Sequence, residues 1–111
     1  MNHEKLDCYR KLLFLAEELT TQSLRWPKGN AYLADQLKRA ISSALLNLAE
    51  GNGKQQGRAE RNRFFQMSLG SIAEVAAILD LAKTFRFSKR EDVERQKGTL
   101  SHTYNQIRRL P

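Results

Sequence analysis

The stretch Ala40-Ile41-Ser42-Ser43-Ala44-Leu45-Leu46-Asn47-Leu48-Ala49-Glu50-Gly51-Asn52-Gly53 decides the fold of this chain. Its apolar residues recur at intervals of three and four as far as Leu48, which is the spacing of one face of an α-helix. Gly51 then stands where many helices end on a residue in the left-handed conformation. We therefore expect a helix that stops at Gly51, followed by a tight and exposed connection.

Three further segments carry helical spacing, so we expect helices at about residues 4–23, 31–50, 58–84 and 89–109. In the first, Leu13 and Phe14 belong to the expected apolar face. Pro27 and Gly29 interrupt the pattern between the first two segments. The sequence Ser88-Lys89-Arg90-Glu91 matches a capping box, in which Ser88 would begin the fourth helix. Four helices of similar length joined by short connections predict an all-α fold, a single antiparallel up-and-down four-helix bundle over residues 1–111.

The charge balance points to a polyanionic partner. The 111 residues carry a formal net charge of +7 and a pI near 9.9. We expect nucleic acid first and an anionic membrane surface second, although a basic surface without a partner remains open. One cysteine, Cys8, cannot form an internal disulfide and suggests a reducing compartment, so we expect a cytoplasmic protein. We find no signal peptide and no apolar run of about 20 residues that would span a bilayer.

Two basic clusters fall at opposite ends of such a bundle. One surrounds the second connection, and the other lies in residues 83–90, which contain no acid; together they comprise Lys54, Arg58, Arg61, Arg63, Lys83, Arg86, Lys89 and Arg90. Lysine and arginine contacts to phosphate confer affinity without reading sequence. Trp26, Phe85 or Phe87 could stack on unpaired bases, or could instead fill the core. The basic clusters could likewise be ordinary solvated helix ends.

A polar stripe runs beside the leucine face of the second helix and includes Arg39, Ser43, Asn47 and Glu50. On the third helix, Ser71 and Glu74 flank the apolar face, and Gly70 would let another helix approach closely. Ion pairs could join Arg39 to Glu74 and Glu50 to Arg58, or these could be ordinary surface charges.

Several apolar residues fall outside the main stripes, namely Leu46, Met67, Ile78 and Phe85. A monomeric bundle would leave some of them exposed, and exposed apolar patches commonly mark interfaces. We therefore expect a homo-oligomer, unless a wide core covers these side chains.

The sequence contains no recognisable motif for a metal site, an activated nucleophile or a phosphate-binding loop, so we expect no enzyme and no cofactor. His3 and His102 have no cysteine or second histidine at metal-ligand spacing. Cys8 has no histidine placed to activate it and is expected at the margin of the core. Gly51-Asn52-Gly53 follows a helix rather than a strand, which excludes the common phosphate-binding loops.

Three motifs together resemble a known family: Gln36-Leu37-Lys38-Arg39-Ala40-Ile41-Ser42-Ser43, then Asn47-Leu48-Ala49-Glu50-Gly51, then Ser68-Leu69-Gly70-Ser71-Ile72-Ala73-Glu74. The chain resembles, over about residues 5–110, the four-helix bundle proteins encoded in intervening sequences of bacterial 23S ribosomal RNA genes. The resemblance implies a bundle that assembles as a ring-like pentamer and has a role in binding RNA. The chain is also similar to the accessory proteins of diversity-generating retroelements, which work beside a reverse transcriptase.

The sequence thus predicts a non-catalytic oligomeric bundle that binds nucleic acid, RNA above all, through basic ends. The alternative is an adaptor that binds another protein, for example a polymerase.

Overall fold

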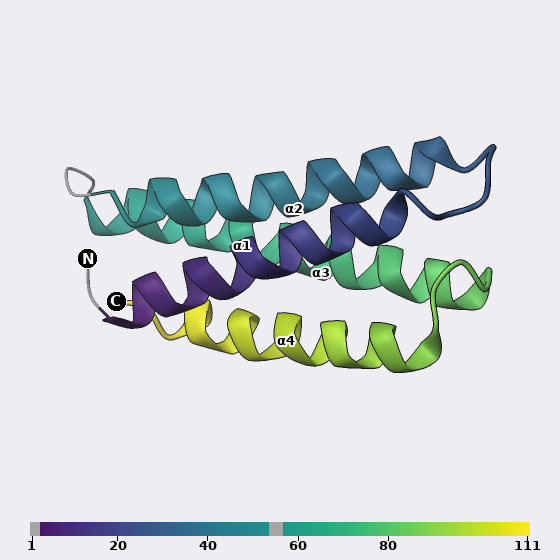
Figure 1. Cartoon of the computed structure of the whole chain (residues 1–111). Coiled ribbons are helices and arrows are strands. Elements are labelled where there is room, and N and C mark those ends of the chain that lie inside the picture. The colour runs from purple at the N-terminus through teal and green to yellow at the C-terminus, as the bar shows by residue number, and fades with distance from the viewer. Residues whose placement is uncertain (1–2, 54–56) are drawn as a thin grey trace.

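A computed structural model describes residues 3–53 and 57–111 and contains four helices (Figure 1). They are α1 (His3–Ser23), α2 (Ala31–Gly51), α3 (Arg58–Thr84) and α4 (Arg90–Arg108), and the described residues form no strand. The helix bounds differ from the expected ranges by a residue or less at every end. The prediction of an all-helical chain with four helices is therefore confirmed.

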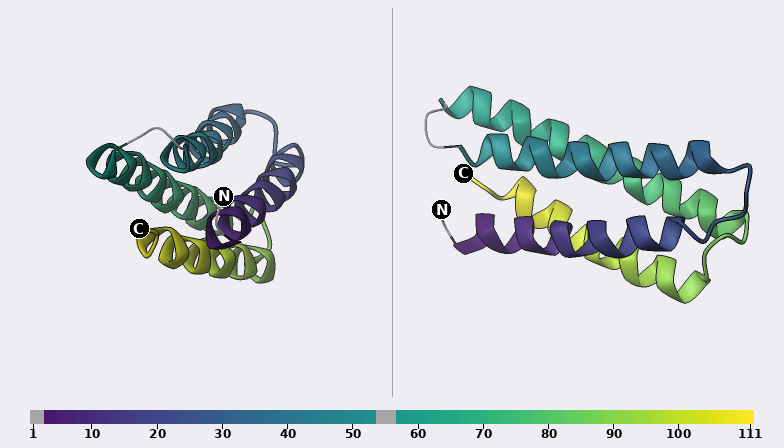
Figure 2. Two further views of the ribbon diagram at one scale, coloured as in Figure 1. Left: turned by 90° about the vertical axis from the view of Figure 1, so that its left-hand side faces the viewer. Right: turned by 45° about the horizontal axis from the view of Figure 1, so that its top comes forward.

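The helices run alternately up and down, and each packs beside its neighbours in the chain, while α1 also packs on α4 (Figure 2). The resulting bundle measures 44 × 23 × 18 Å. Both termini lie at the end that carries the α2–α3 connection. The α1–α2 and α3–α4 connections lie together at the other end (Figure 1). We call the first the terminal end and the second the loop end.

The core is a continuous apolar column contributed by all four helices, with α2 and α3 as the most closely packed pair. Burying these side chains supplies the main driving force for folding, because each large aliphatic side chain contributes about 1.5–3 kcal/mol when removed from water. The largest fully buried side chains include Leu12, Leu19, Leu33, Leu37, Ile41, Leu48, Ile72, Leu79, Leu100 and Ile107. Each of them lies on an apolar face recognisable from its spacing.

Three side chains depart from the expected apolar faces. The sequence predicts Phe14 and Leu13 on the core face of the first helix, yet they are 77% and 51% exposed. Consecutive apolar residues turn 100° apart on a helix, so the run from Leu12 to Leu15 cannot all face one side. Conversely, Ile78 is buried, because the long α3 packs on both α2 and α4 and needs a wider buried face.

Gly51 ends α2 for a different reason from the one expected. It does not adopt the left-handed conformation; it is the last helical residue, followed by Asn52 at φ −79°. Phe65 of α3 packs directly over it: a Cβ added to Gly51 would lie 2.6 Å from Cδ1 of that ring. Glycine at this position therefore permits the close approach of α3 to α2.

The capping-box interpretation of Ser88 is wrong. Helix α4 begins at Arg90, its N-cap residue is Lys89, and no side chain caps it. The Ser88 hydroxyl instead accepts hydrogen bonds from Trp26 Nε1, at 3.0 Å, and from Gln22 Nε2, at 2.8 Å. Long-range partners, which the local motif does not register, thus determine the role of this residue.

Within the described part of the chain, α3 is the helix whose length and composition would allow it to cross a bilayer. This corrects the expectation that no segment has that character. The apolar residues of α3 pack on α2 and α4, and a core helix of a bundle passes the same test.

Replacing Gly51 by alanine should destabilise the fold by about 1–3 kcal/mol, because the added methyl group overlaps the buried Phe65 ring. The matched control is Gly98→Ala on α4, where a Cβ meets nothing within 4 Å. That change should stabilise the protein by up to about 1 kcal/mol through helix propensity. Urea unfolding at one fixed protein concentration measures both, and effects of the same sign would contradict the packing described here.

Candidate nucleic-acid interface

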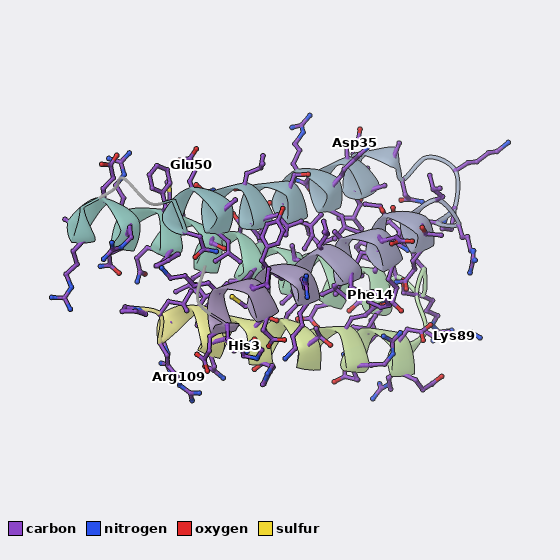
Figure 3. The ribbon with its side chains drawn as sticks, turned by 60° about the vertical axis from the view of Figure 1, so that its left-hand side comes forward. His3, Phe14, Asp35, Glu50, Lys89 and Arg109 are labelled. Carbon is purple, nitrogen blue, oxygen red and sulfur yellow. The ribbon has the colours of Figure 1, made fainter. Side chains whose placement is uncertain are left out.

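The predicted basic residues lie at both ends of the bundle. Figure 3 shows Lys89 at the loop end and Arg109 at the terminal end, on opposite sides of the molecule. Lys54 lies outside the described residues. The two ends differ in the exposure and ion pairing of their basic side chains.

At the terminal end, Arg58 and Arg63 are exposed, and Arg61 is half-buried. The Arg63 guanidinium carbon lies 5.8 Å from the centroid of the Phe64 ring, in the geometry of a cation–π contact. Arg108 and Arg109 at the end of α4 are also exposed. This end therefore presents cations without a freely exposed aromatic ring among the described residues.

At the loop end, Lys83 is already neutralised, which the sequence did not indicate. Its Nζ lies 2.8 Å from Glu94 Oε1 and 4.0 Å from Asp80 Oδ1, and Lys97 holds the same Asp80 carboxylate at 2.7 Å. The hydrogen bond from Lys83 lowers the pKa of the Glu94 carboxyl. Lys83 therefore joins α3 to α4 along the side of the bundle.

The other three predicted cations of this end, Arg86, Lys89 and Arg90, are exposed and make no ion pair with any described residue. They line a hollow of about 560 Å³ together with Lys83, Phe87 and Ser88. This hollow, which we call the basic hollow, is open to solvent and is bordered by the start of α4.

Arg86 adopts a left-handed conformation with φ +63°, which is uncommon for a residue with a side chain. Its N–H donates to the Lys83 carbonyl at 3.0 Å, and the Phe87 N–H donates to the Ala82 carbonyl at 2.8 Å. These two bonds form the Schellman arrangement that closes a helix. The tight turn fixes the direction in which the flanking residues Phe85 and Phe87 leave α3.

Three aromatic rings form a row beside the basic hollow. The centroids of Phe85 and Phe87 are 5.5 Å apart, and those of Phe87 and Trp26 are 6.0 Å apart. Trp26 is buried at 7% exposure, whereas Phe85 is 46% exposed. The core alternative is thus correct for Trp26, and Phe85 is the ring of this row that remains accessible.

A chain of hydrogen-bonded polar side chains leads from the buried Gln96 to Trp26 of the aromatic row, and the sequence pattern did not predict it. Gln96 is fully buried and donates from Nε2 to Gln22 Oε1 at 2.7 Å, and Gln22 in turn donates to Ser88. Gln96 sits three residues after Val93 and four before Leu100, so a polar residue on the apolar face of the fourth helix was the available signal. Arg95 adds a two-pronged ion pair to Glu18, at 2.6 and 3.1 Å, and lowers the pKa of that carboxyl.

The predicted polar stripe of α2 forms a seam with α3 in its central part only. Ser71 and Ser43 share a hydroxyl hydrogen bond of 2.8 Å, and Asn47 Nδ2 donates to the Ser43 carbonyl at 2.9 Å. The buried Ser68 hydroxyl donates to the Ala44 carbonyl at 2.8 Å.

The charged residues outside this seam are more exposed than the seam residues. Arg39, Glu50 and Glu74 are exposed. Among the described residues, no ion pair joins Arg39 to Glu74 or Glu50 to Arg58, so these two hypotheses are not supported.

Gly70 and Leu46 face outward. A Cβ on Gly70 would meet nothing within 4 Å, so no helix of this chain approaches it. Leu46 is 67% exposed and borders a shallow hollow with Arg39, Ser43 and Asn47. Both residues are therefore open to a second molecule.

The model of the 23S rRNA-intervening sequence protein family matches residues 4–109, which is nearly the whole chain. The chain belongs to this family. A crystal structure of a protein from the S23 ribosomal protein family of Bacteroides thetaiotaomicron superposes with a TM-score of 0.80, at 17% identity, over 94% of each chain. At that identity the likeness concerns the fold. No curated protein matches the chain.

This member of the family shows little capacity for side-chain catalysis at its cysteine. Cys8 is fully buried, and desolvation raises the pKa of its thiol to about 11. The thiol therefore stays protonated at neutral pH, whereas a nucleophilic cysteine needs its thiolate. Within residues 3–53 and 57–111, no three His, Cys, Asp or Glu side chains gather in a way that could hold a metal ion.

Substituting Ser88 by alanine should destabilise the protein by about 1–3 kcal/mol, because the buried Trp26 N–H and the Gln22 amide lose their acceptor. The control is Glu91→Ala, since a capping box would need a Glu or Gln side chain at that position. In the structure it is an exposed first-turn acid whose loss costs less than about 1 kcal/mol. A larger effect at Glu91 than at Ser88 in thermal unfolding would restore the capping box and contradict the observed contacts.

Proposed function

We propose that the protein is a non-catalytic, oligomeric bundle of the cytoplasm that binds nucleic acid, with RNA as the favoured ligand, through the basic ends of the bundle. The observation that carries this proposal is the position of the unneutralised cations. The ion pairs between described side chains run along the flanks of the bundle and involve Lys11, Lys83, Arg95 and Lys97. Among the cations at the ends, Arg58, Arg63, Arg86, Lys89 and Arg90 make no ion pair with any described residue.

Unpaired lysine and arginine side chains on an exposed surface attract phosphate most strongly, because binding releases the counterions that surround the polyanion. Arg86, Lys89 and Arg90 at the loop end, and Arg58 and Arg63 at the terminal end, meet this description. The formal charge of +7 adds long-range attraction to the same ligand. The family description, which names a 23S rRNA intervening sequence, favours RNA over DNA.

Binding of a labelled RNA should weaken steeply with salt, and the quadruple variant Arg58→Glu, Arg63→Glu, Lys89→Glu, Arg90→Glu should lose at least tenfold in affinity. Its plot of log affinity against log salt should also become flatter, because the slope is about −0.7 per phosphate neutralised on a single strand. Fluorescence anisotropy at several salt concentrations measures both quantities.

The control must change the net charge equally at a different place, and Arg10→Glu with Lys38→Glu replaces two exposed cations midway along the bundle. It is compared with the double variant Lys89→Glu, Arg90→Glu. The end variant should lose more affinity and more slope than the control. Equal losses would mean that net charge alone acts, and would contradict binding at the ends.

We also propose that the bundle self-associates through α3, with a ring of five copies as the expected assembly. Met67, Gly70, Glu74, Ala77 and Leu81 recur at three and four residues, and all five are exposed. This seven-residue repeat, in which every side chain except Glu74 is small or apolar, suits a helix lying nearly parallel to α3. The same stripe supports the second candidate function, an adaptor that binds another protein such as a polymerase.

Light scattering at micromolar concentration should give a mass above that of one chain, and Ala77→Glu should lower it. Ala77 is exposed, so the substitution puts a charge into the stripe without disturbing the core. The control, Ala31→Glu, makes the same exchange at the exposed start of α2 and should leave the mass unchanged. A wild-type monomer would contradict self-association and leave the stripe to a different protein.

A further inference from the structure

We propose that the loop end binds unpaired nucleotides, with a base stacked on Phe85 and the flanking phosphates held by Arg86, Lys89 and Arg90. This inference rests on the proposed nucleic-acid binding and names the form of nucleic acid that the site takes. Three features of the described residues support it: an anchored aromatic row, unneutralised cations beside it, and the absence of this pair of features at the opposite end.

The exposed Phe85 ring is held in place by the row behind it. It packs on Phe87 at 5.5 Å, Phe87 packs on Trp26 at 6.0 Å, and the buried Trp26 donates a hydrogen bond of 3.0 Å to Ser88. The innermost ring is fixed by the core and by a hydrogen bond, and Phe85 packs on this row with one side of its ring, so part of its freedom is already lost. A rigid ring stacks on a base at a smaller cost in conformational entropy than a mobile one.

The three cations are close to the aromatic row through Phe87, so we expect them to hold the phosphates of a nucleotide stacked on Phe85. Arg86 directly follows Phe85 in the chain, and its left-handed conformation sets it apart from the axis of α3. Lys89 and Arg90 line the basic hollow together with Arg86 and Phe87. Two acids follow at the start of α4, but Asp92 lies 3.7 Å from Arg95, which partly neutralises it, and Glu91 is a single exposed carboxylate.

The terminal end lacks this combination among its described residues. Its aromatic residues are committed within the protein: Arg63 lies over the Phe64 ring, and Phe65 is buried against Gly51. The cations there can hold phosphates of any nucleic acid. The two ends are therefore chemically different, and base stacking is assigned to the loop end.

The pairing of an exposed ring with cations selects for unpaired nucleotides. In a duplex the faces of the bases are stacked on one another and cannot meet a protein ring, whereas unpaired bases can be splayed onto an aromatic side chain. Stacking is tolerant of sequence, because every base presents a π face. The site should thus distinguish single strands, loops and bulges from continuous helix, without reading a defined sequence.

The test uses the full chain, a labelled 15-nucleotide RNA of mixed sequence, and the same RNA annealed to its complement. Phe85→Leu keeps an apolar side chain but removes the ring, and should weaken single-strand binding by about tenfold to a hundredfold. Its effect on duplex binding should be less than about threefold. Phe85→Trp should retain or strengthen single-strand binding. The control is Phe14→Leu, which removes a ring that is 77% exposed, lies among side chains of both charges and does not line the basic hollow. It should change neither affinity.

Tryptophan fluorescence can report binding at the loop end, because Trp26 is the single tryptophan of the chain and is the last ring of the aromatic row. Single-stranded RNA should change its fluorescence in the wild type and in Phe14→Leu. If single strand and duplex bind equally and Phe85→Leu is silent, while the end-charge variants still weaken binding, this inference is overturned and the proposed function stands. If RNA binding shows no salt dependence at all, both are overturned. Circular dichroism confirms that each variant keeps its helices.

Discussion

The hydroxyl of Ser88 joins the two connections at the loop end, and the arrangement of that end depends on it. It accepts hydrogen bonds from Trp26 in the α1–α2 connection and from Gln22 at the end of α1. Gln22 is bonded in turn to the buried Gln96 of α4. Two segments distant in sequence, residues 22–26 and 88–96, are therefore fixed to one another by a short polar chain. Because these groups are largely removed from water, an unmade bond in this chain would be costly.

The apolar spacing was sufficient to predict the four helices and the column of large aliphatic side chains, since burial of one face per helix is a local property of the sequence. It was insufficient where a contact from another helix decides a role. Gly51 looked like a left-handed helix end but accommodates Phe65, and Ser88 looked like a cap but accepts from Trp26. Phe14 fell on the wrong face because adjacent apolar residues give an ambiguous stripe.

The sequence was sufficient to predict which basic residues lie at the candidate site. It was insufficient to predict which of them are exposed and free of ion pairs. Lys83 and Arg86 are three residues apart and equally basic in the sequence, yet Lys83 is held by Glu94 while Arg86 projects from a tight left-handed turn. The three aromatic residues were likewise equal candidates until burial separated Phe85 from Trp26. Ion pairing and burial depend on which helices become neighbours, so a list of charges overstates the charge that a ligand meets.

The most direct test of binding at the loop end is hydrogen–deuterium exchange of the full chain with and without single-stranded RNA. The account predicts slower exchange of the amides in residues 85–92, where α4 begins without a side-chain cap, and unchanged exchange in the middle of α2. Slowing that is confined to the middle of the helices, with none in residues 85–92, would contradict it.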